Sequence, residues 1–275
     1  MKRHPTSRFN VIASPYAVWA ALFIIAPLIF VVYYSFTDAA GAFTTENVSA
    51  LSKYLPTFLR SIWFGIVATL ICLVIAYPTA YLISQKTENI QRTMVLLVML
   101  PMWMSFLIRT YSWMAILEDE NGIINGFLAN LGLPRVHMIN TSFAVILGMV
   151  YNFLPYMIMP IYSVMAKLDR SMVEAAQDLG GSRLTVIRRC IIPMSMPGVV
   201  SGITMVFVPS VSTFYISQKL GGGAFDLIGD VIERQFQQSY NYNLGAALSL
   251  VLMVLILISM AVMNRFTGDE EGMAI

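Results

Sequence analysis

The residues whose types and spacing could do chemistry gather in one polar stretch, Asp169–Gly198, of an otherwise apolar chain. Ser171 and Glu174 have the spacing of a capping box, in which hydroxyl and carboxylate satisfy each other's backbone amides, so a short helix should begin near Met172. Gly180 permits the positive φ that turns the chain after a helix. The stretch predicts a helix built for docking, with candidate residues Ser171, Glu174, Ala175, Ala176, Asp178, Leu179 and Gly180.

No side chains are spaced for catalysis or for binding a nucleotide. The sequence has no G-x-x-x-x-G-K-[ST] phosphate loop, no H-E-x-x-H and no G-x-S-x-G. His4 and His137 stand alone, and Cys72 and Cys190 do not suggest a metal site. We therefore expect a protein that is not an enzyme and that holds no cofactor or metal of its own.

Aromatic side chains near the middle of the chain could attract an amine. Four side chains fall at i, i+3, i+7 and i+10, on one side of a predicted helix: Trp103, Phe106, Thr110 and Trp113. An aromatic face attracts an ammonium group by about 0.5–2 kcal/mol. The candidates for lining an amine path are Trp103, Trp113, Tyr151 and Tyr215, although large aromatic residues in helix bundles usually fill space or lie at interfaces. Arg109 should face protein or water, as a tether or a snorkelling side chain rather than a cargo contact.

A second candidate site lies in the segment Phe225–Phe236, which the apolar spacing predicts to be a helix. Three carboxylates share the side opposite the apolar one and could form an acidic strip on the outer face: Asp226, Asp230 and Glu233. A solvated polar face is the alternative interpretation.

The elements that position these residues are membrane spans. Hydrophobic residues make up 57% of the 275 positions and charged residues only 12%, and mean hydropathy is +0.71, whereas soluble domains carry about 25% charged residues. A net charge of +2 gives no basic stripe for nucleic acid. Six apolar runs are long enough to cross a bilayer, at about 11–36, 58–83, 94–117, 142–165, 191–215 and 244–264.

The distribution of Lys and Arg predicts the orientation. If the N-terminus is inside, eleven of the 17 basic residues fall on the cytoplasmic side. The tails 1–10 and 265–275 and the loop 166–190 are then cytoplasmic.

Several motifs carry a family resemblance. Glu174-Ala175-Ala176, Gly180 and Ile192-Pro193 resemble the EAA motif of ABC-importer permeases, with Cys190 and Ile192 replacing the usual Ile and Leu. The stretches 101–111, 149–160 and 167–169 look like those of PotB-type permeases of spermidine/putrescine importers. The similarity spans most of the chain.

This resemblance implies an all-α integral membrane protein of six transmembrane helices with the type I ABC importer permease (MetI-like) fold, in a bacterial inner membrane. It implies a permease subunit for polyamines, in which the EAA segment is the coupling helix. The implied partners are a second permease (PotC-type), two cytosolic ATPases (PotA-type) that hold ATP and Mg, and an extracytoplasmic binding protein (PotD-type). Another ABC-imported solute, or a self-sufficient secondary transporter, remain as alternatives; the latter would carry ionisable residues in mid-span, where this chain has Arg109.

Overall fold

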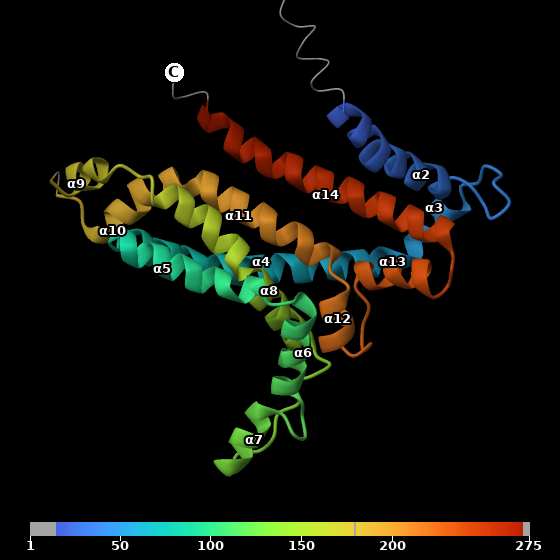
Figure 1. Cartoon of the computed structure of the whole chain (residues 1–275), viewed down its shortest axis with the longest axis horizontal. Helices are drawn as coiled ribbons and strands as arrows, with labels where there is room; N and C mark the ends of the chain where they lie inside the picture. Colours follow the sequence, from blue (N-terminus) through green and yellow to red (C-terminus); the bar gives the residue numbers. More distant parts are fainter. Residues whose placement is uncertain (1–14, 179, 272–275) are drawn as a thin grey trace, which may run out of the picture. The chain divides into compact units, whose positions relative to one another are not determined.

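The computed structural model describes residues 15–178 and 180–271, which form helices joined by turns (Figure 1). Within these ranges no β-strand occurs, and one isolated bridge joins Thr37 and Phe43. The predicted all-α class is therefore confirmed. The chain forms two compact units, Met1–Leu55 with Val231–Leu255 and Pro56–Asp230 with Ile256–Ile275.

The first unit begins with the helix Pro15–Ser35, which has a π-helical turn before its last segment α2 (Ala26–Ser35). Two asparagine side chains hold the turn that follows α2. Asn47 donates from Nδ2 to the Thr37 carbonyl at 2.9 Å, and Asn243 donates to the same oxygen at 2.7 Å. The unit also contains α3 (Glu46–Ala50), η2 (Leu51–Tyr54) and the first part of α14 (Tyr242–Glu271).

The second unit is built around α8 (Ser142–Met165) and α11 (Ile192–Ser212), which pack along each other (Figure 1). Two glycines of α11 permit the close approach. A Cβ atom on Gly198 would lie 2.8 Å from the Pro160 carbonyl oxygen, and one on Gly202 would lie 3.2 Å from that of Met157. Small residues at such an interface allow two membrane helices to pack closely.

The other helices of this unit surround that pair or extend from it. They are α4 (Leu55–Ser84), α5 (Glu88–Met99), η3 (Leu100–Trp103), α6 (Phe106–Leu117), α7 (Ile123–Asn130), α9 (Arg170–Asp178), α10 (Arg183–Val186), η4 (Ile187–Ile191), α12 (Tyr215–Leu220), the first turn of α13 (Ile228–Gln237) and the end of α14.

Five described helical stretches are long and apolar enough to cross a membrane: Pro15–Ser35, Glu46–Ser84, Ser142–Met165, Arg183–Ser212 and Tyr242–Met263. The expectation of one continuous third helix over 94–117 is wrong. Glu88–Trp103 and Phe106–Leu117 meet at 87°. If this bent pair forms one span, the described residues contain six candidate membrane spans. Pro101 cannot donate a helical hydrogen bond, so the chain tightens into η3 and leaves the helix at Met104, whose backbone is extended.

Candidate functional site

The polar stretch predicted to dock another protein contains α9, which a carboxylate caps at its start. Asp169 Oδ1 accepts a hydrogen bond from the Ser171 amide at 2.9 Å, and this bond holds the pKa of Asp169 below its usual value. The helix begins at Arg170 rather than near Met172. The predicted capping box is therefore wrong, because Asp169 supplies the cap and Ser171 lies within the first turn.

Two glycines end α9 with two hydrogen bonds. The Gly180 amide donates to the Gln177 carbonyl at 2.8 Å, and the Gly181 amide donates to the Ala176 carbonyl at 3.1 Å. This pair of bonds is a Schellman motif, and Gly180 has the φ of +82° that the motif requires. The predicted positive-φ turn is confirmed. Leu179 lies outside the described residues.

The chain re-enters a helix after Ser182. The Ser182 hydroxyl caps α10 by accepting a hydrogen bond from the Thr185 amide at 3.3 Å. η4 then leads into α11. Between α8 and α11 there is thus one short helix, α9, followed by the capped start of a helix that continues from α10 through η4 into α11.

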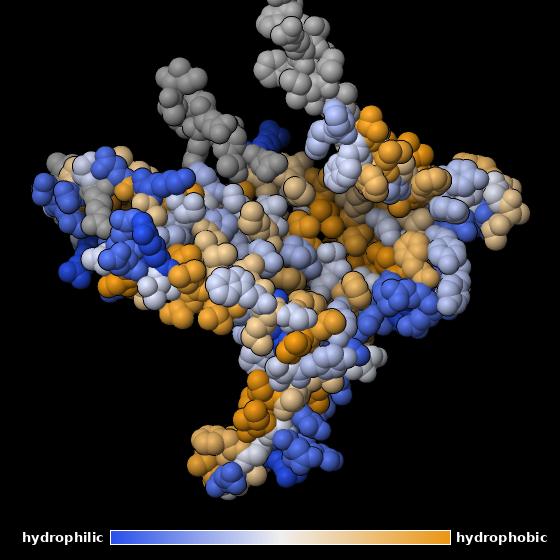
Figure 2. Space-filling view, in the orientation of Figure 1, coloured by the Kyte–Doolittle hydropathy of each residue, from blue (hydrophilic) through white to orange (hydrophobic). Residues whose placement is uncertain are grey.

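One side of α9 packs on the core and the other is exposed. Val173 and Ala176 are half-buried against the core, one turn apart. The exposed residues of α9 are Ser171, Met172, Glu174, Ala175, Gln177 and Asp178. Figure 2 shows hydrophilic side chains gathered over the α9 and α10 end.

Two large apolar side chains interrupt this hydrophilic surface and were not expected. Met172 on α9 is 52% exposed and Leu184 on α10 is 75% exposed. An apolar side chain on the polar face of a short amphipathic helix is the signal that could have identified them. They give the surface apolar anchors of the kind that protein partners bury.

The aromatic candidates do not form one stripe, which corrects the predicted arrangement. Trp103 lies before the break in the third span and is 73% exposed. Trp113 on α6 contacts Tyr151 on α8, with ring centroids 5.4 Å apart. Tyr215 lies on α12, after a break at Thr213, and not in the fifth span.

Tyr215 belongs to a second ring cluster that already has a cation on it. Its ring contacts those of Phe106 and Tyr111 at 6.0 and 6.3 Å. The Lys219 ammonium lies 5.6 Å from the centroid of Tyr111 and 5.8 Å from that of Tyr215. The protein's own lysine therefore occupies the faces on which an amine would sit.

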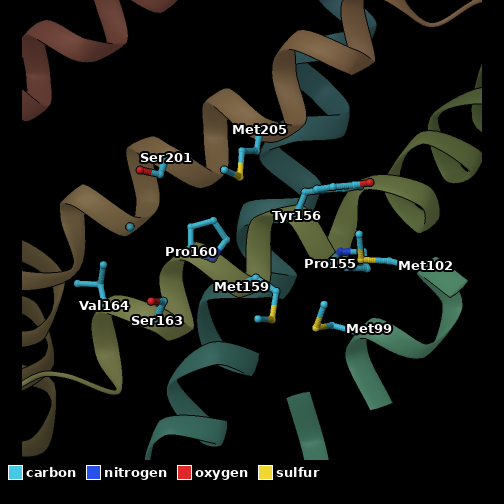
Figure 3. Close-up of a pocket in the computed structure, with 11 residues that line it drawn as sticks. Met99, Met102, Pro155, Tyr156, Met159, Pro160, Ser163, Val164, Ser201 and Met205 are labelled. Carbon is cyan, nitrogen blue, oxygen red and sulfur yellow. The ribbon is translucent and has the colours of Figure 1, made fainter. Parts of the chain in front are cut away.

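A recess of about 550 Å³ opens between the α5–η3 segment, α8 and α11, and no charged residue lines it. Figure 3 shows four methionines around it: Met99, Met102, Met159 and Met205. Tyr156, Ser163 and Ser201 also line it. Pro160 has no N–H to donate to the Tyr156 carbonyl, so the usual helical hydrogen bond is missing here. Flexible thioethers with a few oxygens suit an aliphatic chain that carries hydrogen-bond donors. This recess could not be predicted from the sequence, because methionines in an apolar span usually serve only to pack it.

The acidic strip is not formed as predicted. Asp226 precedes α13, which begins at Ile228, so it does not share a helical face with the other two. Asp230 is only 5% exposed; its Oδ1 accepts from the Ser217 hydroxyl at 2.9 Å and its Oδ2 from the Leu227 amide at 2.8 Å. Glu233 is half-buried. Asp230 therefore fastens the start of α13 to α12 instead of facing solvent.

No group of three or more His, Cys, Asp or Glu side chains within residues 15–178 and 180–271 is arranged to hold a metal ion. His137 pairs with Asp119, whose pKa is lowered first by the hydrogen bond from the Met138 amide and then by this histidine. His4 lies outside the described residues.

Solved structures of an importer share this fold. The chain is similar to a bacterial ABC transporter involved in the import of the acidic polysaccharide alginate, with a TM-score of 0.77 over 95% of both chains. A second structure, of the alginate transporter with its alginate pentasaccharide-bound periplasmic protein, gives 0.76 over 94% of this chain and 93% of that one. Both are 17% identical to it, so the likeness concerns the fold. The predicted ABC importer permease fold is confirmed.

Curated relatives align over most of the sequence. The spermidine/putrescine transport system permease protein PotB of Salmonella typhimurium (strain SL1344) is 38% identical over 242 residues, which cover 84% of each chain. PotB of Escherichia coli (strain K12) is 37% identical over 228 residues, covering 79% of this chain and 82% of the relative. Residues 46–268 match the family described as binding-protein-dependent transport system inner membrane component. The chain belongs to this family and is a multi-pass permease of the inner membrane.

Proposed function

We propose that this chain is the permease subunit of an ATP-driven polyamine importer and that α9 is the helix through which the ATPase acts. The observation that carries the proposal is the geometry of α9: a helix capped at both ends that exposes one face and joins the two helices at the centre of the second unit. A rigid helix of this kind transmits force, whereas an irregular loop absorbs it. The proposed coupling residues are those of the EAA segment, with Met172 and Leu184 as apolar anchors.

The path of the force follows from the packing. α9 and α10 connect the end of α8 to the start of α11, and Gly198 on α11 lies against the backbone of α8. If the two ATPase subunits close around ATP and Mg and move α9, this packed pair moves as a unit, which opens and closes the permease in the manner of a rocking domain. The permease itself is proposed to hold neither nucleotide nor catalytic site.

The cargo assignment draws on the relatives and on the methionine recess. The PotB relatives are named for spermidine and putrescine transport. Both are aliphatic chains with terminal ammonium groups, and the recess offers apolar walls with several oxygens and no charged residue. A second, PotC-type permease would complete the path, and a PotD-type binding protein would deliver the cargo.

Stimulated ATP hydrolysis tests the assignment. The chain is reconstituted in proteoliposomes with its second permease, the ATPase and the binding protein. We expect hydrolysis to rise when the binding protein carries spermidine or putrescine, and not with an alginate oligosaccharide and its binding protein. If neither polyamine raises hydrolysis and another solute does, the chain serves a different importer.

The orientation is tested separately. Both termini and α9 are proposed to be cytoplasmic, since the basic residues cluster there under that orientation. A Ser171→Cys variant in a Cys190→Ser background should react with a membrane-impermeant maleimide in inverted vesicles and not in intact spheroplasts. The reverse labelling pattern would place α9 outside and remove the basis for coupling.

Copurification separates this function from a self-sufficient secondary transporter, the second candidate. A tagged chain should recover an ATPase subunit from mildly solubilised membranes. Uptake by the chain alone, driven by an ion gradient, would favour the transporter.

A further inference from the structure

Arg109 is a buried cation whose hydrogen-bond donors lack acceptors. Only 8% of its surface is exposed, and its Nε and Nη1 atoms are buried with no partner within residues 15–178 and 180–271. Buried donors that water cannot reach destabilise a protein unless an acceptor is supplied, and a charged donor does so most strongly. The isolated chain therefore leaves this side chain incomplete.

The start of α6 lies beside Arg109 and places further backbone N–H groups there. The first hydrogen bond of α6 runs from the Arg109 amide to the Ser105 carbonyl at 3.1 Å, and the Ser105 side chain does not cap the helix. The amides before Arg109 have no carbonyl in a preceding turn. The guanidinium carbon lies 5.9 Å from the Phe106 ring, so the side chain reaches back toward this helix end.

Among the described residues, the helices packed around Arg109 carry positive charge and no carboxylate. The Phe106 ring that Arg109 reaches also contacts Tyr215, on which the Lys219 ammonium lies. α6 packs against α7, α8 and α12, and none of these four helices contains Asp or Glu. The positive end of the α6 dipole adds to the two cations. The two cations and the helix dipole all favour binding of an anion at this place and oppose binding of a cation.

We propose that this site receives a carboxylate side chain from the second permease subunit. The proposal rests on the proposed function, in which two permease chains pair. The charge argues against a polyamine in the site, because a polycation would meet two like charges. A carboxylate accepts two parallel hydrogen bonds from a guanidinium and further bonds from helix amides.

The exposed face of α6 supplies the apolar part of the same contact. Leu107, Ile108 and Tyr111 are 47%, 56% and 49% exposed, and they flank the turn that holds Arg109. A helix of the partner that covers these side chains would carry its carboxylate to the guanidinium. A lipid phosphate shares the charge of a carboxylate, but its bulky glycerol ester fits poorly against a group that is nine-tenths covered.

The test compares two substitutions that each remove one arginine. Arg109→Met keeps the length and removes the charge. The matched control is Arg60→Met, because Arg60 is exposed and its guanidinium lies 5.8 Å from the Phe225 ring. Two quantities are measured for each: recovery of the second permease on the tagged chain, and the thermal stability of the chain alone in detergent.

We expect Arg109→Met to weaken recovery of the second permease about tenfold, as loss of a charge-assisted hydrogen bond does. The chain alone should be at least as stable as the wild type, because an uncompensated buried charge has been removed. Arg60→Met should change neither. Arg109→Glu should abolish recovery, and a Lys in place of one carboxylate of the second permease should restore it.

Three results overturn the inference. If the Arg109→Met chain recovers as much of the second permease as the wild type does, Arg109 makes no contact with that subunit. Loss of stability in the Arg109→Met chain alone identifies an internal tether. Recovery by wild type that needs anionic phosphatidylglycerol and fails in zwitterionic phosphatidylcholine identifies an anionic lipid headgroup as the partner. If the wild-type chain recovers no second permease in either lipid, the proposed function itself fails.

Discussion

Replacing Gly180 by alanine separates the mechanical role of α9 from its fold. Gly180 has a φ of +82°, and a Cβ atom there would meet no heavy atom within 4 Å. The cost of Gly180→Ala is therefore the cost of the backbone conformation alone. Gly223 provides the matched control, because it has a φ of +76° and is equally open, but lies in the turn between α12 and α13.

The magnitude follows from that conformation. A left-handed backbone costs an alanine about 1–2 kcal/mol more than a glycine. At 25 °C this lowers the population of the turn by a factor of about 5–30. Both variants carry the same cost, so any difference in transport between them reflects the position of the turn and not its strain. The Schellman bonds to the Ala176 and Gln177 carbonyls are what the Gly180 variant weakens.

Coupling is measured as solute taken up per ATP hydrolysed by the reconstituted importer. We expect Gly180→Ala to lower this ratio several-fold, with normal membrane insertion and the same small loss of thermal stability as Gly223→Ala. Gly223→Ala should leave the ratio unchanged. Equal ratios for both variants and the wild type, with the end of α9 measurably loosened by hydrogen exchange, would refute the view that a rigid α9 transmits the force.

Three further predictions concern the packing of α8 on α11, the loop before α8 and the cap of α9. Gly198→Ala should destabilise the chain by about 1–2 kcal/mol in thermal or SDS unfolding, because its Cβ would lie 2.8 Å from the backbone oxygen of Pro160. The control Gly126→Ala, in open space on α7, should instead stabilise the chain by about 0.5–1 kcal/mol. Asn125→Ala should destabilise the loop 118–138 by about 1–3 kcal/mol, seen as faster proteolysis there, because its fully buried amide group pairs with both the N–H and the C=O of residue 136. The stabilisation by the Asp169 cap should be fully present above the unfolded-state pKa of about 3.9 and be lost as pH falls through the lowered folded-state pKa of Asp169. Faster hydrogen exchange of α9 at low pH should show this loss. Asp169→Asn, which caps without a charge, should remove the pH dependence of that exchange.

The long apolar helices could be predicted from the sequence because hydropathy alone determines them. The fourth predicted span, 142–165, has the bounds of α8. Predicting this helix needs no information beyond its own residues. The Gly180 turn was equally local, since only glycine accepts its backbone conformation without strain.

The start of α9 was ambiguous in the sequence because two residues able to cap stand two positions apart. Asp169 and Ser171 both accept hydrogen bonds from backbone amides. The structure uses Asp169, and Ser171 then becomes the donor. The presence of Glu174 three residues after Ser171 favoured the wrong choice.

The break in the third span was hidden for a different reason. Pro101 was visible, but prolines are tolerated within membrane helices, and Pro78 lies inside α4 without ending it. The residues on both sides of Met104 are apolar, so hydropathy does not distinguish a bent pair from one helix. The break decides the chemistry here, because it creates the helix start beside Arg109.

The contrast between Asp230 and Arg109 shows why charge alone could not assign roles in this chain. Both are buried ionisable residues. Asp230 finds its donors on its own chain, at Ser217 and the Leu227 amide, so its charge is used to fasten two elements. Arg109 has buried donors without acceptors in a neighbourhood of four helices that lack carboxylates. Burial with partners on the same chain gives Asp230 a structural role, whereas the buried donors of Arg109 are those for which we propose an acceptor on the second permease.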